Sequence, residues 1–120
     1  MSSLVLGVGM SSKATRAGVA RLVEEVVTMA NSPIESVAVL ATRSKFVADE
    51  RLQLGMMVMG IDDEDLLALF GAPRPAGFAA RVAEGCAMIG AGERARLLVA
   101  PVRGTFVTVA LAQRTDSSDQ

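Results

Sequence analysis

The chain has 120 residues, of which 51% are hydrophobic and 21% are charged, a balance that fits one globular domain and excludes disorder over the whole length. Its 12 basic and 13 acidic residues give a net charge of -1, which argues against a general nucleic-acid binder. No run of about 18 apolar residues occurs, so we expect no transmembrane helix and no membrane association. The N-terminal segment also lacks the basic start of a secretory signal.

The residue types that the chain lacks narrow its chemistry. It contains no histidine, tryptophan or tyrosine, and Cys86 is its single cysteine. A Ser-His-Asp or Cys-His pair therefore cannot form within the chain, and neither can a cysteine-rich zinc site. We expect no metal site and no cofactor, so any catalysis would rest on carboxylates, lysines, arginines or hydroxyls. A single cysteine cannot form an intrachain disulfide, which fits a cytoplasmic protein.

The first part of the chain alternates strand and helix patterns. An apolar run containing glycines predicts a buried strand over Ser3–Gly9. Apolar residues at spacings of three and four then predict an amphipathic helix over Lys13–Ala30, with Ser11 or Ser12 as its N-cap. A second buried strand is expected over Val37–Ala41, closing at Thr42.

The remainder continues this alternation and ends in two strands joined by a short connection that permits a hairpin. In chain order we expect a short helix (Ala48–Leu54), a strand (Gly55–Gly60), a helix (Glu64–Phe70), a loop (Gly71–Gly77), a helix (Phe78–Ile89) and two strands (Arg96–Ala100 and Thr105–Ala112).

Strands that alternate with helices predict an α/β fold. We expect a single three-layer α/β/α domain over residues 1–112, with a mixed, mainly parallel five-stranded sheet whose last strand is antiparallel. Residues 113–120 would form a polar C-terminal tail. The side chains expected in the core include those of Val5, Val8, Val39, Val99 and Val109.

Gly7 and Gly9 lie at the carboxyl end of the first expected strand, where open α/β sheets place ligand sites. Glycines let a ligand approach the backbone, and the amides of a following helix can bind an anion. The segment is neither a Rossmann fingerprint, which needs a third glycine where Ser12 stands, nor a phosphate-binding P-loop. A tight turn with no ligand is the alternative interpretation.

Cationic and hydroxyl side chains follow the expected strand ends. Lys13 and Lys45 are the only lysines, and Arg103 lies between the last two strands. Because parallel strands end at one edge of a sheet, these cations could converge on a carboxylate-bearing ligand. Ordinary surface charge is the alternative. The hydroxyl groups beside the lysines are those of Ser11, Ser12, Thr42 and Ser44.

Three other features have simpler structural interpretations. Met10 and the methionines of 56–59 could form a soft apolar site, but core packing explains them better. Cys86 lies among small apolar residues, which predicts a buried, inert thiol. The acidic run Asp62–Asp65 sits at an expected helix start, which favours capping and solvation over metal binding.

Four short segments, spread in order over nearly the whole chain, carry a family resemblance. They are Leu6–Met10 with the helix after it, Ala41-Thr42, Val82–Met88, and Leu98–Pro101 followed by Val107–Ala112. In this order they resemble the CobE and CbiG C-terminal family of cobalamin-biosynthesis proteins. The short length is similar to the stand-alone members rather than to the longer two-part members.

The chain departs from the family pattern at three places. Met10, Ser11 and Ser12 stand where the family has a cysteine followed by basic residues. The segment Arg43–Phe46 lacks the acid of the family pattern and has a shifted lysine, and Val102 replaces a lysine, with Arg103 beside it. By contrast, Glu84 and Thr108 match the pattern directly.

The resemblance implies a cytoplasmic role in building the corrin ring, with a precorrin or cobalt-corrinoid intermediate as partner. Stand-alone members resemble carriers or accessory binders, and the methionines or Phe46 would suit the ring. The implied ligand-binding residues are Gly7, Gly9, Met10, Ser11, Ser12, Lys13, Thr42, Ser44, Lys45, Glu84 and Arg103.

Two other functions stay open at this point. Two-part relatives are associated with opening a ring lactone and releasing acetaldehyde, so the chain could be a hydrolase with Glu84 or a lysine as its proton-transfer group. It could also be a domain that docks on another cobalamin-biosynthesis enzyme. The sequence assigns no catalytic residue.

Overall fold

A computed structural model describes residues 3–70, 78–92 and 94–114. Its centre is a five-stranded sheet with the strand order β3-β2-β1-β5-β4. The strands are β1 (Ser3–Met10), β2 (Val37–Arg43), β3 (Met57–Ile61), β4 (Ala95–Arg103) and β5 (Val107–Arg114).

The strand directions agree with the sequence-based prediction. β1 pairs in parallel with β2, and β2 pairs in parallel with β3. β5 is antiparallel to both of its neighbours, β1 and β4. The first four strands therefore run in one direction, and their carboxyl ends meet at one edge of the sheet beside the start of β5.

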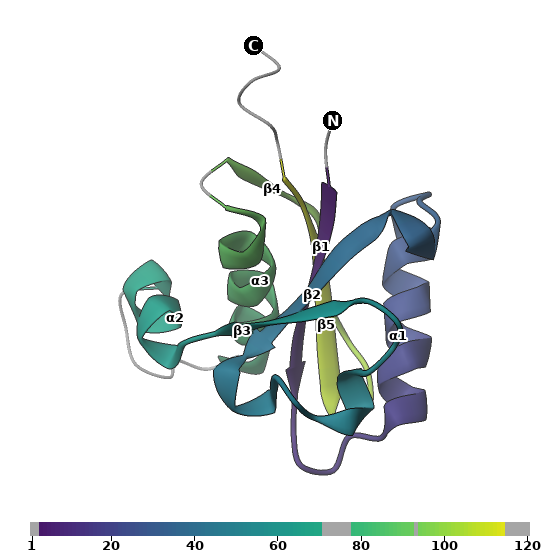
Figure 1. Cartoon of the computed structure of the whole chain (residues 1–120), viewed down its shortest axis with the longest axis horizontal. Coiled ribbons are helices and arrows are strands. Elements are labelled where there is room, and N and C mark those ends of the chain that lie inside the picture. The colour runs from purple at the N-terminus through teal and green to yellow at the C-terminus, as the bar shows by residue number, and fades with distance from the viewer. Residues whose placement is uncertain (1–2, 71–77, 93, 115–120) are drawn as a thin grey trace.

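Helices cover both faces of this sheet, so the predicted three-layer arrangement is confirmed. Figure 1 shows α1 (Arg16–Met29) on one side and both α2 (Asp63–Phe70) and α3 (Phe78–Ala91) on the other. Short 3-10 helices, η1 (Ile34–Ser36), η2 (Ser44–Phe46) and η3 (Glu50–Leu52), join the first three strands. No helix in the described part of the chain has the length and apolarity needed to span a membrane.

The two faces of the sheet pack differently. Side chains alternate along a strand, so Leu4, Leu6 and Val8 of β1 face α1 and join a core of valines and leucines. The opposite face carries Val5 and small residues, which pack against α3. The core facing α1 is therefore built from branched side chains, and the core facing α3 depends on close approach.

Gly7 shows how close that approach is. A Cβ atom at this position would lie 2.5 Å from the Ala87 amide nitrogen and would overlap the Ala83 carbonyl oxygen. The backbone of β1 thus lies directly against α3, and no residue other than glycine fits between them. This packing role accounts for Gly7 without a ligand.

Several element boundaries differ from the prediction. α1 begins at Arg16, because the Thr15 side chain caps it by accepting a hydrogen bond from the Gly18 amide, so neither Ser11 nor Ser12 is the N-cap. The short helix expected over 48–54 is reduced to η3, with η2 before it. The last strand continues to Arg114.

The expected core is largely confirmed. Val5, Val8, Val99 and Val109 are buried, whereas Val39 is only half-buried, because it pairs with the exposed Met57 of edge strand β3. The loop expected over 71–77 lies outside the described residues.

Replacing Gly7 tests the close contact between β1 and α3. We expect Gly7→Ala to lower the free energy of unfolding by roughly 3 kcal/mol, the upper end of the usual cost of overpacking, because the neighbouring atoms are backbone. Urea unfolding measures the change. Gly55→Ala is a matched control, since nothing lies within 4 Å of its added Cβ. Its φ of 92° should cost only about 1 kcal/mol. Equal losses for both variants would contradict the packing argument.

Candidate functional site

A pocket of about 460 Å³ lies at the edge where the four strands end. Its described lining comes from the end of β1, the hairpin between β4 and β5, and one residue each from β2 and α3. These residues are Gly9, Met10, Ser11, Arg43, Val82, Arg103, Gly104, Phe106, Val107 and Thr108. Pockets of this size commonly take small molecules.

The lining combines positive charge with apolar surface. Arg43 and Arg103 supply guanidinium groups, Ser11 and Thr108 supply hydroxyls, and the remaining side chains are aliphatic or aromatic. Of the residues predicted from the sequence, the pocket brings together Gly9, Met10, Ser11 and Arg103. Such a lining suits an anion attached to an apolar body.

The loop after β1 and the hairpin after β4 are joined directly. The Ser11 amide donates a hydrogen bond to the Phe106 carbonyl oxygen at 3.0 Å. The Lys13 ammonium lies 5.7 Å from the centroid of the Phe106 ring, a cation–π contact. The predicted residue Lys13 therefore sits beside the pocket, in contact with one of its lining residues.

Arg43 reaches the pocket from the end of β2 but is already paired. Its Nε and Nη2 atoms donate hydrogen bonds of 2.8 and 2.7 Å to the two oxygens of Asp63, the first residue of α2. These hydrogen bonds raise the pKa of Arg43 above its ordinary value. The pair ties α2 to the sheet and compensates the charge of Arg43.

Arg103 and Lys13 differ from Arg43 in this respect. Both are exposed, and within residues 3–70, 78–92 and 94–114 neither forms an ion pair with a carboxylate. Their charges therefore remain available to an anionic ligand at the pocket, as does that of the exposed Lys45, which lies at the same edge of the sheet but outside the described lining.

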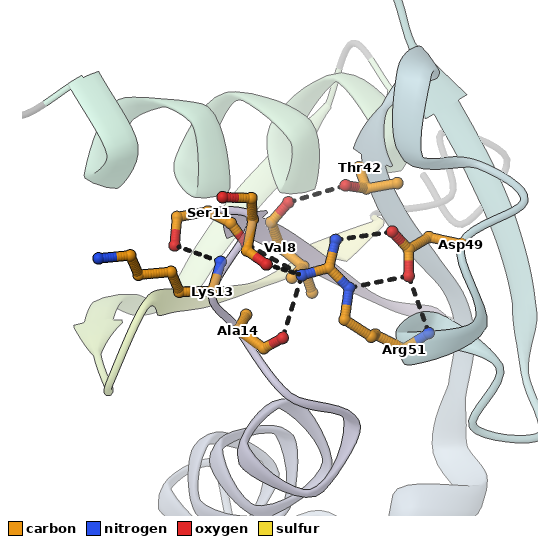
Figure 2. A network of polar contacts seen from close by, with 8 residues as sticks. Val8, Ser11, Lys13, Ala14, Thr42, Asp49 and Arg51 are labelled. Carbon is orange, nitrogen blue, oxygen red and sulfur yellow. Dashed lines mark hydrogen bonds and ion pairs between the residues drawn. The ribbon is translucent and has the colours of Figure 1, made fainter.

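A further arginine, Arg51, holds the loop that leads from β1 into α1. Figure 2 shows the Arg51 guanidinium among the carbonyl groups of this loop. Its Nη1 atom donates hydrogen bonds to the carbonyl oxygens of Ser11 at 3.0 Å and Ala14 at 3.1 Å, with a longer one to Ser12 at 3.4 Å. The loop carbonyls point inward to Arg51, so the shape of the loop depends on this residue.

Asp49 in turn holds Arg51. Its two oxygens accept from Nε at 2.9 Å and Nη2 at 2.7 Å, and Oδ1 also accepts from the Arg51 amide. These hydrogen bonds lower the pKa of Asp49 below its ordinary value. The clamp, defined here as Asp49 and Arg51, keeps residues 11–14 in place next to the pocket.

Four other predicted site residues lie outside the described pocket lining. The buried Thr42 hydroxyl donates to the Val8 carbonyl oxygen at 3.0 Å, which joins β1 and β2 (Figure 2). Ser44 donates to Asp62 at 2.6 Å, and Lys45 lies 5.0 Å from the centroid of the Phe46 ring. Glu84 is half-buried on α3 and does not belong to the described lining.

Cys86 is buried in the contact between α3 and the sheet. Desolvation by this burial raises the pKa of the thiol to about 12. The thiol is therefore protonated at neutral pH and has no access to the pocket, as the sequence predicts. Within the described residues, no group of three or more acidic or cysteine side chains could hold a metal ion.

Sequence reasoning missed the Asp49–Arg51 clamp and did not name six of the described lining residues as ligand-binding: Arg43, Val82, Gly104, Phe106, Val107 and Thr108. Arg43 directly follows Thr42, so its position at a strand end offered a signal of the kind used for Lys45. Phe106 offered none, because its place in the pocket depends on β5 lying next to β1. Arg51 contacts residues about forty positions earlier in the chain, a contact that only the tertiary fold defines.

The clamp predicts a stability difference that depends on pH. A carboxylate with a lowered pKa stabilises the fold above its unfolded-state pKa, and this contribution is lost as the pH falls through the lower folded-state pKa. We expect Asp49→Asn to be less stable than the parent by about 1 kcal/mol at neutral pH. The difference should shrink as the pH falls below about 4.

Urea unfolding at a series of pH values measures this difference. Glu50→Gln, which alters the exposed neighbour of Asp49, is the control and should track the parent. Asn keeps an oxygen that can accept from the Arg51 amide, so the comparison measures the loss of the negative charge together with the hydrogen bond that Oδ2 accepts from Nη2. A gap between Asp49→Asn and the parent that stays constant into the acid range would contradict the prediction.

The raised pKa of Cys86 predicts slow thiol chemistry. In the native protein at neutral pH, Ellman's reagent should react at a small fraction of the rate seen after unfolding in urea, because the thiolate is scarce and the sulfur is covered. The absorbance of the released chromophore gives both rates. Rapid reaction of the native protein would show that α3 leaves the thiol accessible.

No family model and no curated protein sequence matches the chain. Solved structures do share its fold. The crystal structure of CobE, a protein from the cobalamin biosynthetic pathway, superposes with a TM-score of 0.79 at 23% identity, covering 93% of this chain and 90% of that one. Cobalamin biosynthesis protein chiG from Agrobacterium tumefaciens gives a TM-score of 0.72 at 22% identity, covering 94% and 99% of the two chains.

A cobalamin biosynthesis protein G homolog from Sulfolobus solfataricus is similar over part of its length. Its TM-score is 0.71 at 18% identity, and the match covers 94% of this chain but 37% of that one. The same fold thus occurs within a longer chain. The resemblance seen in the sequence is confirmed at the level of the fold: the chain has the architecture shared by these cobalamin-biosynthesis proteins.

Proposed function

We propose that this protein binds a carboxylate-rich corrin-ring intermediate of cobalamin biosynthesis, as a carrier or accessory binder. The observation that carries the proposal is the pocket at the strand ends, where uncompensated cations border an apolar hollow. The shared fold with CobE supplies the pathway. Corrin intermediates are macrocycles fringed with acetate and propionate groups, so they present both carboxylates and an apolar ring.

The charges are arranged for recognition of carboxylates. Arg103 lines the pocket from the end of β4, and Lys13 lies beside it over Phe106. A guanidinium can hold a carboxylate through two parallel hydrogen bonds, and an ammonium adds a point charge. Arg43 also lines the pocket, but its charge is compensated by Asp63, so it is not counted among the cations that would hold the ligand.

The apolar part of the lining suits the ring. Met10, Val82, Phe106 and Val107 give the pocket, which has a volume of about 460 Å³, a mainly apolar surface. That volume accommodates an edge of a macrocycle and leaves the rest of it outside the protein. A carrier benefits from such a partial grip, because the exposed part of the ligand stays accessible to the next enzyme.

The same lining favours binding over lactone hydrolysis. The described lining residues include no carboxylate and no thiol, and Glu84, the acid suggested by the family resemblance, is not one of them. A proton-transfer group must reach the reacting atoms within hydrogen-bond distance. We therefore place hydrolysis second to binding, and analysis of reaction products for acetaldehyde distinguishes the two.

Removing the uncompensated cations tests the proposal. We expect Arg103→Ala and Lys13→Ala each to weaken binding of cobyrinic acid, a corrin with free carboxylate side chains, by roughly 10- to 100-fold, the usual value of a charge-assisted contact. The shift of the corrin visible spectrum on titration gives the dissociation constant. The melting temperature should stay nearly unchanged, since both side chains are exposed.

Arg96→Ala is the matched control for this experiment. Arg96 is also an exposed arginine on β4, but it pairs with Gln113 near the opposite end of the strand. Its loss should leave binding unchanged. Lys45→Ala shows whether the site extends to the second lysine that the sequence indicates. Binding that is unaffected by both Arg103→Ala and Lys13→Ala would overturn the proposed site.

A further inference from the structure

We propose that Phe106 is a stacking platform for the flat ring system of the ligand, with the cations of Lys13 and Arg103 at its margin. This inference rests on the proposed function. It adds the side chain that would let the pocket distinguish a flat conjugated ring carrying carboxylates from a carboxylate without a ring. It comes from three features of Phe106: the conformation of its backbone, the exposure of its ring and the contacts that hold its turn.

The first feature is the backbone. Phe106 has a φ of 65°, one of the two non-glycine residues with positive φ in the described chain. Turn positions with positive φ are occupied mainly by glycine, asparagine and aspartate, because a Cβ clashes there with the backbone. A phenylalanine at this position is therefore strained, and such strain persists where a side chain serves a function.

The second feature is the exposure of the ring. Phe106 is 49% exposed and lines the pocket, although only 3% of the residues in the chain are aromatic. It belongs to neither hydrophobic core, so burial of the ring within the fold does not offset the free-energy cost of the backbone strain. An apolar ligand that covers the ring would remove this surface from water, and the free energy gained would offset the strain.

The third feature is the way the residue is held. The Phe106 carbonyl accepts from the Ser11 amide, and the Gly104 amide donates to Val107 at 2.7 Å, which closes the turn. Arg51 fixes the far side of the loop that contains Ser11. The ring is thus carried by a turn tied to its neighbour, and the Lys13 ammonium 5.7 Å from its centroid is within reach of a carboxylate on a stacked ligand.

Phe46 offers a comparison within the same protein. It too has a lysine over its ring, with Lys45 at 5.0 Å and Arg51 at 5.9 Å from the centroid. Phe46, however, packs against the core on the α1 face and does not line the pocket. The family resemblance implied that the methionines or Phe46 would suit the ring; of these aromatic and methionine side chains, Met10 lines the pocket and Phe46 does not, and the platform proposed here is Phe106.

The experiment compares two ligands and three variants. Uroporphyrin carries carboxylates on a flat tetrapyrrole, and tricarballylate carries carboxylates without a ring. We expect Phe106→Asn and Phe106→Leu to weaken uroporphyrin binding by about tenfold or more, because the stacked surface is lost. Tricarballylate binding should stay unchanged. Fluorescence anisotropy of the porphyrin and calorimetry for tricarballylate supply the dissociation constants.

Thermal melting completes the design. Phe106→Asn should melt at or above the parent temperature, because asparagine tolerates the left-handed backbone. A variant that keeps its stability and loses affinity would show that Phe106 serves ligand binding and not folding. Phe46→Leu is the control, expected to lower the melting temperature and to leave uroporphyrin binding intact.

The outcomes separate this inference from the proposed function. If the parent binds uroporphyrin and the Phe106 variants bind it equally well, the platform is wrong and the carboxylate site stands. Equal loss for both ligands would mean that Phe106 only shapes the pocket, which also overturns the platform. If the parent binds neither uroporphyrin nor tricarballylate nor cobyrinic acid, the proposed function itself fails, and the platform with it.

Discussion

The contact of backbone with backbone between β1 and α3 is the constraint on which the rest of the molecule depends. Because Gly7 has no side chain, α3 packs directly against the central strand through Ala83 and Ala87. This approach fixes the height of α3 over the sheet, and Gly90 repeats it further along, where an added Cβ would come within 3.1 Å of both Val5 and Ala41. Val82 is thereby brought above the strand ends, where it forms one wall of the pocket.

On the other side of the pocket, polar contacts take the place of close packing. The loop after β1 has no core of its own, and Arg51 supplies the donors that its carbonyl groups need, with Asp49 holding the guanidinium in turn (Figure 2). The Ser11 amide then fixes the turn at Phe106. The clamp therefore positions the loop, and the loop positions the hairpin turn at Phe106. A weakened clamp should change the shape of the pocket.

The sequence predicts the parts of this structure that depend on local pattern. Apolar runs with glycines located the strands, and helical spacing located α1 and α3. It could not show that the last strand lies between β1 and β4, because strand order depends on contacts across the whole chain. That pairing is what brings Phe106 to Ser11 and places Arg103 beside Thr108 at the same pocket, which explains why Arg103 was found through its charge and Phe106 was missed.

The arginines at this edge of the sheet fall into two groups, those paired with a carboxylate and those that are not. Arg43 is held by Asp63, and Arg51 is held by Asp49, so both work as parts of the scaffold. Arg103 and Lys13 meet no carboxylate within the described chain, yet they border an apolar hollow where an unpaired charge gains most from an anion. The same contrast distinguishes Phe46, which is half-buried against the core, from Phe106, which is exposed and has a positive φ. Arg43 and Arg51 are satisfied within the fold, whereas Arg103, Lys13 and the exposed ring of Phe106 meet at one pocket, which is the physical reason for proposing a ligand there.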